Sequence, residues 1–114
     1  MSEYMINEDK IAEIVIDFEQ LREKQLDESF IGMFGAWVKI LLKRMFGNSS
    51  MPVKVKGSRS EVESFARTLG GEKRYIETAS KYGLDDPRTY KNKAKLTKAI
   101  NNFERATGLK WPFN

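Results

Sequence analysis

The 114-residue sequence contains neither cysteine nor histidine. Without cysteine, the chain has no disulfide, no thiolate nucleophile and no thiolate ligand for zinc or an iron–sulfur cluster, and this composition fits a reducing compartment. Without histidine, it lacks the commonest metal ligand and the commonest general base of enzymes. We therefore expect a protein that is not an enzyme and that uses no cofactor or metal ion.

Long uncharged apolar runs are also absent. The most apolar stretch is FIGMFGAWVKILLKRMFG, residues 30–47, and it is interrupted by Lys39, Lys43 and Arg44. Because a membrane-spanning helix needs about 20 largely uncharged apolar residues, we predict no transmembrane segment. A helix lying on a membrane surface remains an alternative, since tryptophan and phenylalanine opposite lysine are typical of such helices.

The N-terminal sequence MSEYMINEDK is acidic and polar, whereas a signal peptide begins with basic and then apolar residues. We therefore expect a cytoplasmic protein. The length indicates one domain, and the balance of 40% hydrophobic and 32% charged residues is typical of a globular chain. Within this single helical domain, 1–114, we expect an N-terminal helical hairpin at 1–47, a linker or strand at 48–57 and a basic helical half at 58–114.

A first helix is predicted over residues 7–26. Apolar side chains recur there at spacings of three and four, at Ile11, Ile14, Phe18 and Leu21. Charged residues fill the gaps, so the pattern is that of an amphipathic helix with a solvated face. The β-branched run at 14–16 is also compatible with the start of a strand.

A second helix is predicted over the apolar stretch, with Asp27 or Ser29 as its cap. Its apolar side chains cover a broad arc of the helix surface, which implies more than one neighbour. We expect this helix to pack on residues 11–21 of its own chain and on a second copy. The predicted interface residues, which include two aromatic residues near the C-terminus, are Phe30, Met33, Phe34, Trp37, Leu41, Met45, Trp111 and Phe113.

Residues 51–57, MPVKVKG, alternate apolar and basic side chains, which is the pattern of a half-buried strand. The sequence offers this strand no clear partner. A lone strand with unpaired edges is unfavourable. It therefore pairs with another subunit, pairs with an extended terminus, or is only an extended connector.

Ser60 and Glu63 have the spacing of a capping box and predict a helix over residues 60–82. Gly70-Gly71 interrupts this helix, and because each glycine costs about 1 kcal/mol inside a helix, the pattern leaves open one helix or two. Gly83 followed by Leu84 resembles a left-handed C-terminal cap with its hydrophobic contact.

The clearest helix start is Asp86-Pro87, an N-cap acid followed by proline at the first helical position. We predict that this helix ends at Gly108 and that Leu109 folds back. Its predicted inner face consists of Tyr90, Leu96, Ala99, Ile100, Phe103 and Ala106. We expect Trp111 and Phe113 to hold the C-terminus on a core or on a partner.

The predicted fold is therefore mainly α, with about four helices in a small bundle and at most one short β-strand or hairpin near residues 52–56. The broad apolar helix, the unpartnered strand, the aromatic terminus and the missing catalytic chemistry favour a structural or assembly protein. We expect it to act as a homo-oligomer through a hydrophobic helix interface.

The second half of the chain suggests another function. Residues 58–114 contain 12 Lys/Arg and 7 Asp/Glu, a balance of +5, whereas the whole chain has a balance of +4. On the last helix, a stripe of basic residues recurs at spacings of three and four, at Arg88, Lys91, Lys95 and Lys98. Such a stripe can follow a phosphate backbone, so a nucleic-acid-binding accessory protein is the alternative prediction.

Residues 60–113 resemble small uncharacterised proteins of T4-like marine bacteriophages, most visibly in YGLDDPRTYKNKAKL and in the ending TGLKWPF. The resemblance covers about half of the chain. It implies a phage origin, a location in the host cytoplasm or the virion, and other phage structural proteins as partners. It points to a virion or head-assembly component and transfers no functional residue.

Overall fold

The computed structural model describes residues 14–24, 27–47 and 53–113, with the side chains of residues 28–30 excepted. These residues form two strands and four helices. The elements are β1 (Ile14–Asp17), α1 (Phe18–Glu23), α2 (Glu28–Phe46), β2 (Val53–Lys56), α3 (Arg59–Tyr82) and α4 (Pro87–Thr107).

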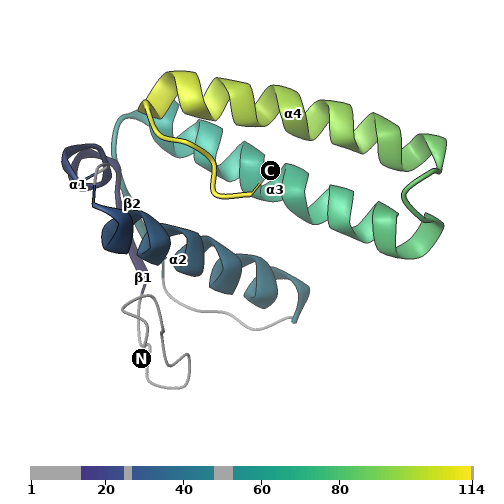
Figure 1. Ribbon diagram of the computed structural model, residues 1–114. Coiled ribbons are helices and arrows are strands. Elements are labelled where there is room, and N and C mark those ends of the chain that lie inside the picture. Colours follow the sequence, from purple (N-terminus) through teal and green to yellow (C-terminus); the bar gives the residue numbers. More distant parts are fainter. Residues whose placement is uncertain (1–13, 25–26, 48–52, 114) are drawn as a thin grey trace.

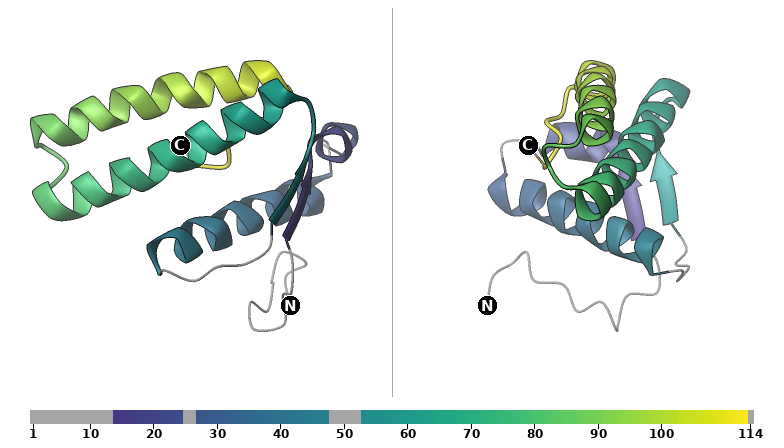
Figure 2. Two further views of the ribbon diagram at one scale, coloured as in Figure 1. Left: turned by 180° about the vertical axis from the view of Figure 1, so that it is seen from behind. Right: turned by 90° about the vertical axis from the view of Figure 1, so that its right-hand side faces the viewer.

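The two long helices α3 and α4 form an antiparallel hairpin, and α2 packs beneath it (Figure 1). The two strands and α1 lie at one end of α2, and the chain after α4 folds back into the space between the hairpin and α2 (Figures 1 and 2). The prediction of a mainly α fold with about four helices and a minimal β element is confirmed.

β1 and β2 form a parallel two-stranded sheet, with Ile14 opposite Val53 and Asp17 opposite Lys56. The strand predicted near 52–56 is therefore present, and its partner comes from the same chain. The prediction of a helix over 14–17 is wrong, because the β-branched run there favours a strand whose alternate side chains are buried. The predicted helix is short and begins at Phe18; residues 7–13 and 25–26 lie outside the described part.

Asp17 makes the change from strand to helix at the start of α1. Its carboxylate accepts hydrogen bonds from the backbone N–H groups of Glu19 (3.1 Å) and Gln20 (3.3 Å). Such a cap satisfies donors that have no partner in the first turn of a helix. It orients Phe18, which is fully buried, toward the core.

The core contains a cluster of aromatic rings from five parts of the chain: α1, α2, α3, α4 and the C-terminal segment. Phe18 makes edge-to-face contacts with Phe65 of α3 and Phe103 of α4, with ring centroids 5.4 and 5.8 Å apart. Phe34 of α2 stacks on Phe103, and Trp111 contacts Phe103 at 5.2 Å. The expectation that Trp111 holds the C-terminus is confirmed, because its ring is buried in the core of its own chain.

α3 is one continuous helix through Gly70-Gly71. A Cβ atom at Gly71 would lie 3.4 Å from Cδ1 of Leu96, an ordinary van der Waals distance. At Gly70 a Cβ atom would meet nothing within 4 Å. Neither glycine breaks the helix, which continues to Tyr82.

The capping box of α3 is formed by Ser58 and Glu61, two residues before the predicted pair Ser60 and Glu63. The Ser58 hydroxyl accepts from the Glu61 N–H at 3.2 Å, and Glu61 accepts from the Ser58 N–H at 2.8 Å. Both pairs have the same spacing in the sequence. The earlier one is formed because Glu61 also binds Arg22 of α1, a long-range contact that local spacing does not indicate.

The turn between α3 and α4 differs from its prediction in two respects. Gly83 has a positive φ of 92°, but its ψ of 164° lies outside the left-handed helical region, so the predicted left-handed cap is wrong. Leu84, predicted to make the hydrophobic contact of that cap, is 65% exposed. The hydroxyl of buried Thr89 instead donates to the Gly83 carbonyl at 2.7 Å and closes the turn. Asp86 caps α4 ahead of Pro87, as predicted.

The inner face of α4 is largely as predicted. Leu96 and Phe103 are fully buried, the helix ends at Gly108 with a φ of 73°, and Leu109 folds back onto the core. Ala99 is an exception, since it lines a surface groove between α3 and α4, and so is Tyr90, which is 59% exposed. Thr89 occupies the buried position of that turn, and the next residue is rotated by about 100° away from it.

Candidate functional site

The most strongly charged surface of the protein lies on α4. This helix contains six Lys/Arg and one Glu. The four residues of the predicted basic stripe are all exposed along it, at Arg88, Lys91, Lys95 and Lys98. Within the described part of the chain, the three lysines form no ion pair or hydrogen bond, so their charges are available to a ligand.

Arg88 differs from the other three because it is already bound. Its guanidinium donates two hydrogen bonds of 2.9 Å to the Asp86 carboxylate and lies 3.3 Å from the centroid of the Tyr82 ring. The side-chain hydrogen bonds from Arg88 lower the pKa of Asp86 to about 2. Arg88 therefore stabilises the start of α4, and the stripe available to a ligand consists of the three lysines.

Lys95 also lines a groove between α3 and α4, here called the cationic groove. Three basic side chains from both helices line it, namely Arg67, Arg74 and Lys95. Its remaining lining residues are small: Ala66, Gly70, Gly71 and Ala99. Sequence reasoning missed Arg67 and Arg74. Their spacing of seven residues places them on one side of α3, but only the packing of α3 against α4 brings them together with Lys95.

The acidic residues of α3 do not neutralise this groove. Glu61 and Glu72 are buried on the core side of the helix, where each accepts a hydrogen bond from another element. The exposed carboxylates are paired within α3, Glu63 with Arg59 at 2.8 Å and Glu77 with Lys73 at 3.1 Å. Arg67 and Arg74 form no ion pair with any described residue.

The groove faces away from the C-terminal segment. Lys93 and Thr97 line a hollow together with Trp111, whereas Lys95 and Ala99 line the cationic groove. Residues two positions apart on a helix point about 200° apart, so these two pairs lie on opposite sides of α4. Among the described residues, the tail and the core thus occupy one side of the hairpin and leave the other uncovered.

The residues predicted for a subunit interface occupy different environments. Three of them are buried within the chain itself, Phe34, Leu41 and Trp111. Three are half-buried, Met33, Trp37 and Phe113, and Met45 is 38% exposed. The side chain of Phe30 lies outside the described residues.

Met33 and Trp37 line a second concave surface, here called the α1–α2 hollow. It has a volume of about 270 Å³ between β1, α1 and α2 and is lined mainly by apolar side chains, including Val15 and Leu21. Asp17 and Gln20 are its polar lining residues. Of the predicted interface residues, Met33, Phe34 and Trp37 line this hollow.

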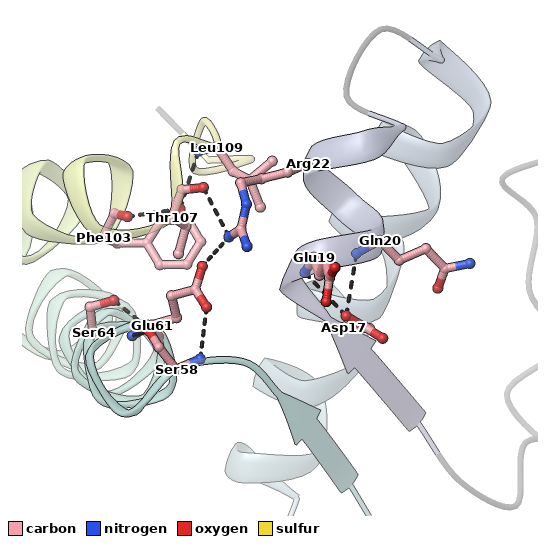
Figure 3. A network of polar contacts seen from close by, with 10 residues as sticks. All are labelled: Asp17, Glu19, Gln20, Arg22, Ser58, Glu61, Ser64, Phe103, Thr107 and Leu109. Atoms are coloured by element: carbon pink, nitrogen blue, oxygen red, sulfur yellow. Dashed lines mark hydrogen bonds and ion pairs between the residues drawn. The ribbon is translucent and has the colours of Figure 1, made fainter.

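Arg22 and Glu61 connect α1 to the α3–α4 hairpin (Figure 3). Arg22 donates to the Glu61 carboxylate and, at 3.4 Å, to the Thr107 carbonyl at the end of α4. Burial raises the pKa of Glu61, but the hydrogen bonds from Ser58 and Arg22 outweigh this effect and lower it overall. Because Arg22 and Glu61 have their partners within the chain, this network holds α1 against the α3–α4 hairpin. It does not offer a free acid or base.

Within residues 14–24, 27–47 and 53–113, no group of three acidic side chains is arranged to hold a metal ion. No helix in this part of the chain has the length and hydrophobicity that crossing a membrane requires. No protein-family model, curated protein or solved structure matches the sequence or the fold, so the function is inferred from the cationic groove and the α1–α2 hollow.

Proposed function

We propose that the protein binds the phosphate backbone of nucleic acid on the open side of the α3–α4 hairpin. One observation supports this proposal most strongly: Arg67, Arg74 and Lys95 line one groove and none of them has an acidic partner among the described residues. Guanidinium groups bind phosphate oxygens through two parallel hydrogen bonds, and lysine adds a mobile positive charge.

The small residues beneath these cations favour contact with a backbone. Gly70 leaves open space where any other residue would place a Cβ atom, so a phosphate can approach the helix closely. Lys91 and Lys98 extend the positive surface along α4. Cations that contact phosphates make no contact with the edges of the bases. We therefore expect binding that depends strongly on salt concentration and little on the nucleotide sequence.

The apolar features that favoured self-association are largely accounted for within the chain. Five apolar residues of α2 are buried in its own core, the strand Val53–Lys56 pairs with Ile14–Asp17, and Trp111 is covered by Phe65 and Phe103. The charged surface on the hairpin has no such internal partner among the described residues. For this reason we place nucleic-acid binding ahead of assembly.

Replacing Arg67, Arg74 and Lys95 with glutamine together is expected to weaken binding to a labelled oligonucleotide at low salt. Each phosphate contact contributes roughly 0.7–0.9 to the slope of log affinity against log salt concentration, so the slope should decrease by about 2. Fluorescence anisotropy across a salt series measures both quantities.

The matched control replaces Lys39, Lys54 and Lys56, which are exposed on α2 and β2, with glutamine. This control variant loses the same net charge, but at positions outside the groove. The slope of log affinity against log salt concentration should therefore be nearly the same as in wild type. Equal losses in the two triple variants would mean that only overall charge matters. Undetectable binding of the wild-type chain at low salt would rule out the proposed function.

Self-association through the α1–α2 hollow is the second candidate function. The half-buried Met33 and Trp37 remain at the surface beside the exposed Val15, so a second copy can cover the apolar area that this chain leaves open. In a phage-encoded chain, such an interface would suit a virion or head-assembly component.

Replacing Met33 with lysine tests this second candidate, because a charge in the hollow opposes its burial by a second copy. If the wild-type chain is a dimer by size-exclusion chromatography with light scattering, the Met33→Lys variant should be a monomer under the same conditions. Met45→Lys, at the exposed end of α2, is the control and should remain dimeric. A wild-type monomer at high micromolar concentration would exclude this function.

A further inference from the structure

The groove between α3 and α4 continues beyond the cationic groove. A second hollow, here called the polar hollow, adjoins it, and Arg67 lines both. The other residues that line the polar hollow are polar or small: Arg59, Ser60, Glu63, Ser64, Asn102 and Ala106. Because the two hollows share one arginine, a ligand bound in the cationic groove can extend into the polar hollow.

Helical spacing places the two hollows in one line. On α3, Ser60, Arg67 and Arg74 follow one another at intervals of seven residues, and on α4 Asn102 comes seven residues after Lys95. Seven residues are close to two turns, so each series stays on one side of its helix. Because the helices are antiparallel (Figure 1), the direction from Arg74 to Ser60 is also the direction from Lys95 to Asn102. At 1.5 Å per residue, the line from Arg74 to Ser60 is about 21 Å long.

A hydrogen bond between the two helices fixes their relative level. The Thr68 hydroxyl donates to the Ala99 carbonyl at 3.2 Å. Thr68 follows Arg67 directly in the sequence, and Ala99 lies between Lys95 and Asn102 on α4. Arg67 is therefore level with the stretch between those two residues, with Lys95 toward one end of the line and Asn102 toward the other.

The polar hollow offers hydrogen bonds where the cationic groove offers charge. Its one lining carboxylate, Glu63, is bound to Arg59 at 2.8 Å. The Asn102 side chain is exposed and forms no hydrogen bond with any described residue. Its amide group can donate to a phosphate or sugar oxygen of a strand that also contacts Arg67.

We propose that Asn102 is a further nucleic-acid-binding residue and that the backbone of one strand lies lengthwise between α3 and α4, from the cationic groove into the polar hollow. This inference rests on the proposed function and adds the path of the ligand. A single phosphate group cannot contact both ends of a line of about 21 Å, whereas a chain of phosphates can. Asparagine is a regular partner of backbone oxygens, and as a neutral side chain it replaces no counterion.

The test compares wild type, Asn102→Ala and Asn101→Ala for binding to a labelled oligothymidylate, a labelled oligoadenylate and the duplex of the two. Asn102→Ala should weaken binding about 2- to 12-fold, the net effect of one hydrogen bond. Its salt slope should equal that of wild type, because no charge is lost. Fluorescence anisotropy across a salt series measures both quantities.

Asn101→Ala is the matched control, because it is the same substitution at the neighbouring exposed position of the same helix. Asn101 lines the hollow beside Trp111, on the side of α4 away from the cationic groove. Both variants change the helix propensity equally, so a difference between them reports contact with the ligand. The control should bind all three oligonucleotides as wild type does.

The outcomes separate this inference from the proposed function. If Asn102→Ala binds as tightly as Asn101→Ala while binding stays salt-dependent, the lengthwise path is disproved and phosphate binding in the cationic groove stands. A loss in Asn102→Ala that is limited to oligoadenylate would mean that Asn102 contacts adenine, and would overturn its assignment to the backbone. If wild type binds none of the three oligonucleotides at low salt, the proposed function itself is disproved.

Discussion

Replacing Phe103 with alanine is expected to lower the free energy of unfolding by about 3–5 kcal/mol, a large part of the roughly 5–15 kcal/mol that stabilises a typical domain. Phe103 is fully buried, and its ring contacts Phe18, Phe34, Phe65 and Trp111. These partners belong to α1, α2, α3 and the C-terminal segment. Truncation therefore leaves a cavity where these four parts of the chain meet α4.

Urea unfolding followed by far-UV circular dichroism measures this loss. Phe113→Ala is the matched control, because its ring is half-buried and contacts Trp111 alone among the aromatic residues described. We expect the control to lose about 1 kcal/mol or less, in keeping with the partial burial of its ring. Equal losses in the two variants would show that Phe103 is not the centre of the core.

Local signals in the sequence predicted the C-terminal helix well. Asp86-Pro87 marks its start, Gly108 its end, and the spacing of Leu96, Ile100 and Phe103 its inner face. Each of these signals acts within one or two turns of the chain, so no distant contact is needed to interpret it. The same reasoning explains why the strand near 52–56 was found from its alternation.

The errors occurred where a distant contact decides between two local alternatives. Residues 14–17 fit a helix or a strand, and pairing with Val53–Lys56 selects the strand. Ser58 with Glu61 and Ser60 with Glu63 both fit a capping box, and Arg22 selects the first. Propensity differences of a few tenths of a kcal/mol cannot outweigh such tertiary contacts.

The candidate site could be predicted only in part for the same reason. The exposed lysines of α4 form a stripe that the helical period indicates directly. Arg67 and Arg74 belong to another helix, and their place beside Lys95 depends on how closely α3 and α4 pack. Gly70 and Gly71, which also line the groove, were interpreted in the sequence only as a weak point of the helix.

A double-mutant cycle on Trp111 and Glu72 should show a strong interaction between the C-terminal segment and α3. The indole N–H of Trp111 donates to Glu72 at 2.9 Å, and both residues are buried, with exposed fractions of 5% and 4%. Trp111→Phe keeps an aromatic ring but leaves the buried carboxyl group without this donor. A buried polar group that loses its partner costs about 1–3 kcal/mol, and more when it is charged.

Glu72→Met keeps a side chain of similar length and leaves the indole N–H without its acceptor, so it should also destabilise the protein. In the double variant neither polar group remains, and its loss should be smaller than the sum of the two single losses by about 1–3 kcal/mol. Additivity to within about 0.5 kcal/mol would mean that the hydrogen bond contributes little. Because Trp111 also donates its backbone N–H to Glu104 at 2.9 Å, the segment stays attached to α4 in every variant, and the cycle measures its contact with α3 alone.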